Sequence, residues 1–232
     1  MVSIRALLRK TALFAAYAAT PNFFLPAFAG ADSQSISASE VPGLIHIPIT
    51  RQATSYTCGA AALASVLHWI DPSLDFTEDM LSRQLKSSSK HGTKIRNIDR
   101  LATSKGLSVS WRDGWTMEDL EKSLHMGRPV IVLIQAYAKA EVVGSVSDWK
   151  FDWKNDWKDG HYVVVNGIDT NNIYMMDPSS RGAYTYIPRQ EFLDRWHDVD
   201  VESRHVHFGM TISDPRKTGV SAYDRDEITR LR

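Results

Sequence analysis

The sequence RQATSYTCGAAALASVLHWI, residues 51–70, changes from a polar loop to an apolar run at Cys58. Eight of the 13 residues from Cys58 to Ile70 are Ala, Leu, Val or Trp, and only Ser65 and His68 have polar side chains, so that a helix over this stretch would be hydrophobic on nearly every side. A helix that is hydrophobic all round is buried. We therefore predict a central buried helix that begins at Cys58 and ends before Asp71-Pro72.

Helical patterns come first along the rest of the chain, and strand patterns follow. Thr77 predicts the N-terminal cap of a helix over residues 78–86, and Thr116 with Asp119 predicts the start of a helix that ends near Met126. Another helix is expected from about residue 93 to residue 105. Strands are expected at residues 44–50, 107–111, 130–135, 161–168, 173–176, 183–187 and 205–212, and a short helix at 189–196. This order predicts the α+β class, with the central buried helix packed on an antiparallel sheet.

The composition is that of an ordinary globular chain with balanced charge. The 232 residues fit one domain or at most two small ones. Lys plus Arg equals Asp plus Glu, at 27 each. This balance gives no electrostatic reason to expect nucleic acid or an anionic membrane as a partner.

The N-terminal segment differs from the rest of the chain. Arg5, Arg9 and Lys10 precede an uncharged apolar run, and a second apolar run follows Pro21 and ends at Ala29. This order is typical of a secretory signal peptide, here with cleavage after Ala29. The alternatives are a retained membrane anchor, for which the interrupted run is short, and a buried helix, which the prolines disfavour. We expect export to the periplasm or the extracellular space, with membrane contact only if the segment is retained as an anchor.

These patterns predict four segments. Residues 1–29 form the signal peptide or anchor, residues 30–43 a linker rich in Ser, Ala and Gly, and residues 44–212 the folded domain. Residues 213–232 are charged and unpatterned, and we expect a frayed C-terminal tail there.

Cys58 is the single cysteine, and its surroundings favour chemistry over an inert position in the core. Cysteine attacks as the thiolate, and the partial positive charge of a helix N-terminus lowers its pKa. Gly59 permits close approach of the backbone, and an N–H group near the helix start could donate to a developing oxyanion. The side-chain amide of Gln52, six residues upstream, could supply a second donor.

A thiol nucleophile needs a base within hydrogen-bonding reach. His161 follows Gly160 at the mouth of a predicted buried strand, where a side chain can face a cleft. Asp177 ends the returning strand and lies roughly opposite His161 across a hairpin that turns at Asn171, so it can orient the imidazole. We predict that Cys58 is the nucleophile, that His161 is the base and that Asp177 orients the base.

The other histidines fit structural positions better. His68 lies within the predicted buried helix and is interpreted as a core residue. His205 and His207 alternate on one predicted strand, but no third residue has the spacing of a metal site, so neither a metal nor another cofactor is expected. Three histidines lie at the ends of predicted elements and are expected to be solvated: His91, His125 and His197.

The tripeptide Asp-Trp-Lys recurs every four residues, around Trp149, Trp153 and Trp157. One interpretation is a surface segment whose tryptophans pack on the domain. The other is an aromatic wall or lid beside a cleft, since the segment leads directly into His161. The sequence leaves both interpretations open.

Several short motifs occur in a defined order: Gln52, CGAAAL at 58–63, GL at 106–107, GRPV at 127–130, GHYVVV at 160–165, DPS at 177–179, EFL at 191–193 and RW at 195–196. This set, which covers about residues 47–196, resembles the bacterial C39 peptidase family, which includes the double-glycine leader peptidases. The resemblance implies a papain-like fold for residues 44–212. It also implies that Gln52 lies in the oxyanion hole, that Cys58, His161 and Asp177 form the triad, and that the substrate is a peptide or protein.

Some properties of that family do not carry over. Its best-known members are fused to an ABC transporter, whereas this sequence has no transmembrane bundle and no Gly-x-x-x-x-Gly-Lys-Ser/Thr phosphate loop. Neither ATP use nor double-glycine specificity is therefore expected.

Three functions stay open on the sequence alone. The first, which we favour, is an exported cysteine peptidase that hydrolyses amide bonds through a thioester on Cys58. The second is an acyl transferase, of the transpeptidase or transglutaminase type, that uses the same triad and shares the first half-reaction. The third is a non-catalytic exported binding module that uses the tryptophan segment as a platform.

Overall fold

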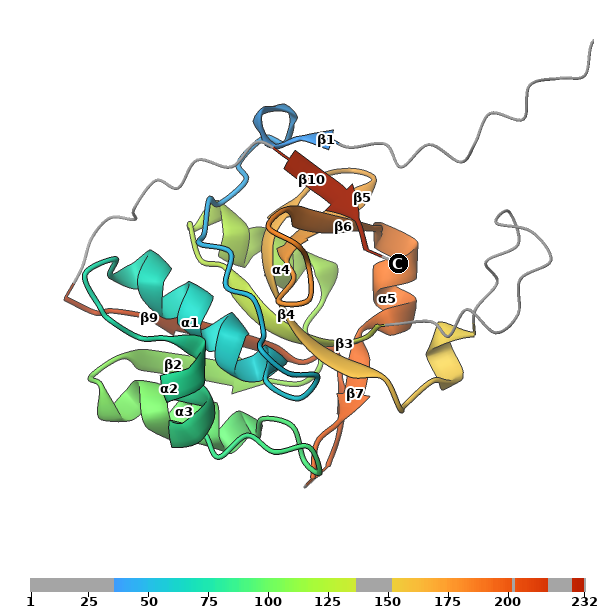
Figure 1. Cartoon of the computed structure of the whole chain (residues 1–232). Helices are drawn as coiled ribbons and strands as arrows, with labels where there is room; N and C mark the ends of the chain where they lie inside the picture. The colour runs from blue at the N-terminus through green and yellow to red at the C-terminus, as the bar shows by residue number, and fades with distance from the viewer. Residues whose placement is uncertain (1–35, 137–151, 202, 217–226, 232) are drawn as a thin grey trace, which may run out of the picture. The chain divides into compact units, whose positions relative to one another are not determined.

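The computed structural model describes residues 36–136, 152–201, 203–216 and 227–231 (Figure 1). These residues all fall within one compact unit, residues 33–232. The expected signal peptide or anchor at residues 1–29 and the first tryptophan of the repeat, Trp149, lie outside the described residues.

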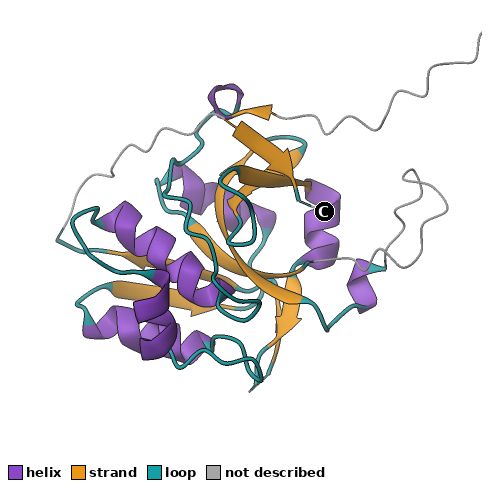
Figure 2. Ribbon diagram, viewed as in Figure 1, coloured by secondary structure: helices purple, strands orange, loops and turns teal. Residues whose placement is uncertain are grey.

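The predicted helices are present, with the predicted caps at two of their starts. Thr77 caps α2 through the N–H of Met80, and Thr116 caps α4 in a reciprocal arrangement with Asp119. Figure 2 shows the helices together with the strands. The α-helices are α1 (Cys58–Ile70), α2 (Glu78–Gln84), α3 (Ile95–Ser104), α4 (Met117–His125) and α5 (Arg189–Arg195), and the short 3-10 helices are η1 (Ala38–Glu40) and η2 (Trp153–Asn155).

An eight-stranded sheet forms the centre of the unit, in the order β1-β10-β6-β5-β4-β3-β9-β2. Every neighbouring pair is antiparallel except β10 with β6. The strands of this sheet are β1 (Ile36–Ser37), β2 (Ser108–Arg112), β3 (Val130–Gln135), β4 (Gly160–Ile168), β5 (Asn172–Met176), β6 (Tyr184–Pro188), β9 (Gly209–Ser213) and β10 (Glu227–Arg230). A separate hairpin pairs β7 (His197–Val199) with β8 (Arg204–Val206). The predicted α+β class is confirmed.

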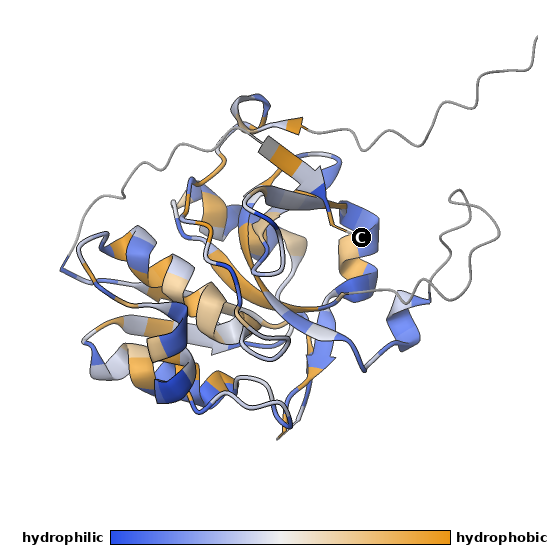
Figure 3. Cartoon of the chain, in the orientation of Figure 1, coloured by the Kyte–Doolittle hydropathy of each residue, from blue (hydrophilic) through white to orange (hydrophobic). Residues whose placement is uncertain are grey.

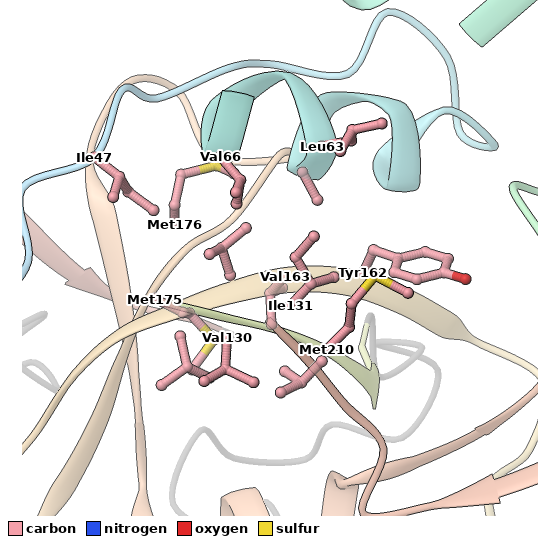
Figure 4. Close-up of a cluster of buried hydrophobic side chains, with 14 of the residues drawn as sticks. Ile47, Leu63, Val66, Val130, Ile131, Tyr162, Val163, Met175, Met176 and Met210 are labelled. Carbon is pink, nitrogen blue, oxygen red and sulfur yellow. The ribbon is translucent and has the colours of Figure 1, made fainter. Parts of the chain in front are cut away.

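Helix α1 packs on the central strands through small and aliphatic side chains. Every residue of α1 is buried except His68, which is half-buried. Figure 4 shows Leu63 and Val66 of α1 above Ile131 of β3 and Val163 of β4. Apolar residues run along α1 and the strands beneath it (Figure 3). Because burial of apolar area stabilises the fold, this contact holds the start of α1 at a defined place over β4.

The strand expected at residues 44–50 does not form. Side chains of the domain make hydrogen bonds to the backbone of this segment, in place of a complete ladder of backbone hydrogen bonds to a neighbouring strand. The Tyr184 hydroxyl accepts from the N–H of Ile47 at 2.8 Å and donates to the carbonyl of the same residue at 2.6 Å. The side-chain amide of Asn166 donates to the carbonyl of Ile45 at 2.9 Å. Pro48 has no N–H to offer a neighbouring strand.

The single strand expected at residues 205–212 is two strands, β8 and β9. The chain turns between them at His207, which has a φ of +53°. A non-glycine residue with positive φ interrupts an extended strand. As a result β8 pairs with β7, while β9 joins the large sheet between β3 and β2.

Both flanking segments contribute to the sheet. Residues 36–43, expected to be linker, include β1, and residues 227–230, expected to be frayed tail, form β10. The two strands pair with each other, and β10 also pairs with β6. Across the described ranges, no helix has the length and apolar character needed to cross a membrane.

Candidate active site

Cys58 is the first residue of α1 and is buried. The N-cap residue, Thr57, makes no side-chain cap, and the first turn holds no acidic residue. Thr57 instead uses its hydroxyl to hold the preceding loop at Thr54. The positive end of the α1 dipole is therefore not neutralised by its own first turn, and it acts on the sulfur of Cys58.

Gly59 lets the start of α1 approach the segment before α3. A Cβ atom at this position would lie 2.7 Å from the Cβ of Thr93, too close for two carbon atoms. The carbonyl of Thr93 in turn accepts a 3.0 Å hydrogen bond from the hydroxyl of Tyr162 on β4. These contacts join the start of α1 to the start of β4, which carries the next residue of the site.

His161 and Asp177 meet within the core. The Nε2 atom of His161 lies 2.6 Å from Oδ1 of Asp177, and both side chains are 1% exposed. The imidazole also forms a hydrogen bond with the thiol of Cys58. Ser179 fixes the carboxylate of Asp177 through its N–H at 2.8 Å and its hydroxyl at 2.8–2.9 Å. The structure thus brings together the three residues that the sequence analysis selected.

The charges of these residues stabilise one another. For Cys58, burial raises the pKa, but the hydrogen bond and charge of His161 and the N–H of Tyr162 outweigh it and hold the pKa below its ordinary value. For His161, burial lowers the pKa, but Asp177 and the sulfur of Cys58 raise it to about 10. Burial also raises the pKa of Asp177, but His161 and the hydrogen bonds from Ser179 outweigh burial and hold the pKa below its usual range. This balance favours a thiolate–imidazolium pair at neutral pH.

Gln52 lies on the loop that leads into Cys58. Its backbone N–H donates to the carbonyl of Pro178, which ties this loop to the residue after Asp177. Its side-chain Nε2 donates to the carbonyl of Thr54 at 2.8 Å. The buried Oε1 of the same amide has no hydrogen-bond partner among the described residues. An amide nitrogen carries two hydrogens, so one remains for a further acceptor.

A pocket of about 410 Å³ adjoins Cys58. Its walls come from the loop that ends at Cys58, the turn at residues 89–93, the segment 157–162 that begins β4, and residues 198–201 of the β7–β8 hairpin. Leu133 of β3 completes the lining. Cys58 therefore faces a space that can hold part of a substrate.

The two described tryptophans of the repeat have different roles. Trp153 is buried and packs under the guanidinium of Arg195, which lies 3.6 Å from the ring centroid. Trp157 lines the pocket, and the centroid of its ring lies 4.4 Å from the centroid of the His197 ring. The packing interpretation therefore holds for Trp153, and the cleft-wall interpretation holds for Trp157.

One expectation about the other histidines changes. His197, expected to be solvated, is buried, and its Nε2 lies 2.6 Å from the carbonyl oxygen of Asp156. His205 is also buried and pairs with Asp113 through Nδ1 at 3.0 Å. Within the described part of the chain, no three His, Cys, Asp or Glu residues are grouped so that they could hold a metal ion.

Comparison with known protein families decides the classification. The model of the Peptidase_C39 like family matches residues 44–202, which is more than half of the chain. The chain belongs to the C39-like peptidase family. The resemblance drawn from the short motifs is confirmed, and membership in this family supports a cysteine peptidase.

One solved structure supports the same fold for this C39-like chain, and two others are also similar to it. The peptidase domain of Streptococcus ComA, a bifunctional ABC transporter involved in a quorum-sensing pathway, superposes with a TM-score of 0.52 at 19% identity, covering 72% of this chain and 98% of the domain. A double-glycine motif protease from an AMS/PCAT transporter, in complex with the leader peptide, has a TM-score of 0.48 at 20% identity, and the match covers 74% of this chain and 94% of the protease. A protein described as a C39-like peptidase from Bacillus anthracis has a TM-score of 0.46 at 16% identity, and the match covers 77% of this chain and 97% of that protein. No curated protein shows significant sequence similarity to the chain.

Sequence reasoning missed the side of the site formed by the β7–β8 hairpin. Asp198 lies in this hairpin, and its carboxylate rests against Gly160, the residue before His161. In the sequence, Gly160 only marks the start of a predicted strand. Nothing in the local sequence pairs positions 160 and 198, since only the folded sheet brings β7 beside β3 and β4.

Proposed function

We propose that this chain is an exported cysteine peptidase that hydrolyses amide bonds of a peptide or protein through a thioester on Cys58. The observation that carries the proposal is the buried series of contacts from Cys58 through His161 to Asp177, beside an open pocket. Burial of a charged histidine and carboxylate is costly unless the charges are paired, and strongly shifted pKa values of this kind cluster at functional sites.

The first half-reaction forms the acyl-enzyme. The thiolate of Cys58 attacks the carbonyl carbon of the scissile amide, and the carbonyl oxygen takes up the negative charge. N–H groups at the start of α1 and the free amide hydrogen of Gln52 stabilise this oxygen. The imidazolium of His161 then gives its proton to the leaving amine as the carbon–nitrogen bond breaks, which leaves a thioester on Cys58.

The second half-reaction restores the enzyme. His161, now neutral, takes a proton from a water molecule as the water oxygen attacks the thioester carbon. The carbon–sulfur bond breaks, the acid product leaves and Cys58 returns to the thiolate form. Asp177 keeps Nε2 of the imidazole occupied throughout, so that Nδ1 faces the sulfur.

Digestion of a peptide library tests this proposal. Mass spectrometry of the products should show new termini, with water added at the cut, for the wild type and none for Cys58→Ala. Addition of an amine nucleophile such as glycinamide separates hydrolysis from acyl transfer. If most products carry the added amine, the chain is an acyl transferase and not a hydrolase. Intact substrates in both proteins would contradict catalysis altogether.

Export rests on the N-terminal order of positive charge, apolar run and small residues before Gly30. Expression of the full chain in a bacterial host and sequencing of the N-terminus of the mature protein tests it. Cleavage after Ala29 and recovery outside the cytoplasm are expected. A protein that keeps Met1 and stays in the cytoplasmic fraction would contradict export.

A further inference from the structure

The pocket beside Cys58 places charges of opposite sign at different depths. Its acidic residue Asp198 is 8% exposed, whereas Lys90 and Lys158 on its rim are exposed to solvent. Asp200 also lines the pocket, but its carboxylate accepts the N–H of Ser203 within the hairpin turn. The deep wall of the pocket is therefore acidic, and its mouth is basic.

The carboxylate of Asp198 is held mainly by neutral groups. Its Oδ1 accepts a 3.1 Å hydrogen bond from the side-chain amide of Gln135, and the N–H of Val199 donates to the same carboxylate. Burial outweighs these bonds and the more distant charges of His205 and His161, and it raises the pKa of Asp198 to about 6. A buried carboxylate in this condition gains stability from a cation that enters the pocket.

Gly160 gives this carboxylate its place. A Cβ atom at position 160 would lie 2.1 Å from both carboxylate oxygens of Asp198, so no residue with a side chain could stand there without displacing them. Gly160 and Asp198 both line the pocket that Cys58 faces. The acidic group therefore belongs to the same space as the nucleophile.

Apolar side chains line the same pocket as Asp198. They are those of Trp157 and, from the β7–β8 hairpin, Val199 and Val201, each 46% exposed. A lysine or arginine side chain has an aliphatic stem that suits such apolar walls and a cationic head that suits the carboxylate. A glutamate side chain would bring a second negative charge to Asp198, and the exposed lysines, screened by water, offset little of that cost.

We propose that Asp198 is a specificity-determining residue that selects substrates carrying a lysine or arginine side chain in the pocket next to Cys58. This inference rests on the proposed peptidase function, because it assumes that the substrate occupies the pocket when Cys58 attacks.

A series of peptidyl chloromethyl ketones tests the inference. In each tripeptide one of the two positions nearest the reactive carbon carries lysine, glutamate, or norleucine, which keeps the four-carbon stem of lysine and lacks its ammonium group. The other positions carry alanine. The thiolate displaces chloride to form a thioether, and intact mass gives the labelling rate. For the wild type, lysine should exceed norleucine at least about tenfold in one position, and glutamate should be slowest.

The variant Asp198→Asn keeps the size of the side chain and removes its charge. It should bring the lysine-to-norleucine rate ratio close to one, while the matched control Asp75→Asn should keep the wild-type ratio. Asp75 is exposed and lies in the loop that follows the C-terminal end of α1, whereas Cys58 lies at the N-terminal end of this helix. A wild-type ratio near one in both positions would overturn the inference, as would a preference that persists in Asp198→Asn. The wild-type comparison decides the matter even if the substitution destabilises the fold.

Iodoacetamide separates failure of this inference from failure of the proposed function. Fast alkylation of wild-type Cys58 by this small reagent, combined with a lysine-to-norleucine rate ratio near one, would contradict only the proposed role of Asp198 in specificity. Alkylation no faster than that of free cysteine would remove the activated thiol and, with it, both proposals.

Discussion

The N–H of Gln52 donates a 2.9 Å hydrogen bond to the carbonyl of Pro178, the residue that follows Asp177. This bond joins the loop before the proposed nucleophile to the loop that holds the proposed orienting residue. The first loop ends at Cys58 and the second begins at the end of β5. One backbone contact thus couples the group that would stabilise an oxyanion to the group that holds the base, although the two are far apart in sequence.

Replacement of the proposed nucleophile should abolish turnover and leave the fold intact. Cys58→Ala removes one sulfur atom from a buried position, so thermal unfolding should shift little, while amide hydrolysis should fall at least about a thousandfold. Turnover of a cleavable peptide and circular dichroism on the same samples measure both effects. Retained hydrolysis in this variant would end the peptidase interpretation.

The proposed base and its proposed orienting partner should differ in their effect on turnover. His161→Ala removes the group that carries the proton, whereas Asp177→Asn keeps a partner for Nε2. We expect kcat/KM to fall about tenfold or more further in His161→Ala than in Asp177→Asn. Steady-state kinetics on both variants, at equal folded fraction, measures the difference. Equal losses would mean that the two roles are misassigned.

Alkylation of Cys58 should depend on pH in two steps. The pKa of Cys58 is lowered and that of His161 is raised to about 10, so the ion pair persists between the two values. As pH falls through the lower value the thiolate gains a proton and the rate drops, and as pH rises through the upper value the imidazolium loses its proton. These values belong to the pair.

The variant His161→Ala is the control for the pH profile. It should show one step, shifted toward the free-thiol value of about 8.5. Iodoacetamide labelling followed by intact mass across the pH range gives both profiles. A wild-type profile with a single step near the free-thiol value would rule out the ion pair.

Gln52 should act on turnover more than on the thiol. Gln52→Ala removes the free amide hydrogen that would stabilise the oxyanion, so kcat should fall about 100- to 1,000-fold. Alkylation by iodoacetamide develops no oxyanion and should change far less. Kinetics with a peptide and labelling with iodoacetamide on the same protein compare the two. If both rates fell by the same factor, Gln52 would be acting through the placement of Cys58.

The Tyr184 hydroxyl should contribute measurably to stability. It bonds both the N–H and the carbonyl of Ile47, and Tyr184→Phe leaves both backbone groups buried without a partner. The free energy of unfolding should fall by about 1–3 kcal/mol. Tyr186→Phe, on the same strand, is the matched control, because the Tyr186 hydroxyl makes no hydrogen bond with another described residue. Denaturant unfolding of both variants measures the effect, and equal stabilities would contradict it.

The sequence determined the elements whose patterns are local. The apolar run at Cys58–Ile70 predicts α1 because a helix without a polar face must be buried. Thr77 and Thr116 mark helix starts because a hydroxyl there satisfies a free backbone N–H. The same reasoning selected Cys58, His161 and Asp177, since a helix start and a hairpin each restrict where a side chain can reach.

Only the tertiary structure decided the rest, because it depends on pairs of distant residues. The segment around Ile47 fails to form the expected strand since the Tyr184 hydroxyl takes its backbone bonds. The expected tail supplies β10 because β6 offers it a free edge. The position of Asp198 against Gly160 arises from the approach of the β7–β8 hairpin to β3 and β4, and no spacing within either segment encodes that approach. Local propensity therefore places the catalytic candidates on their elements, whereas packing between elements decides which charges surround them.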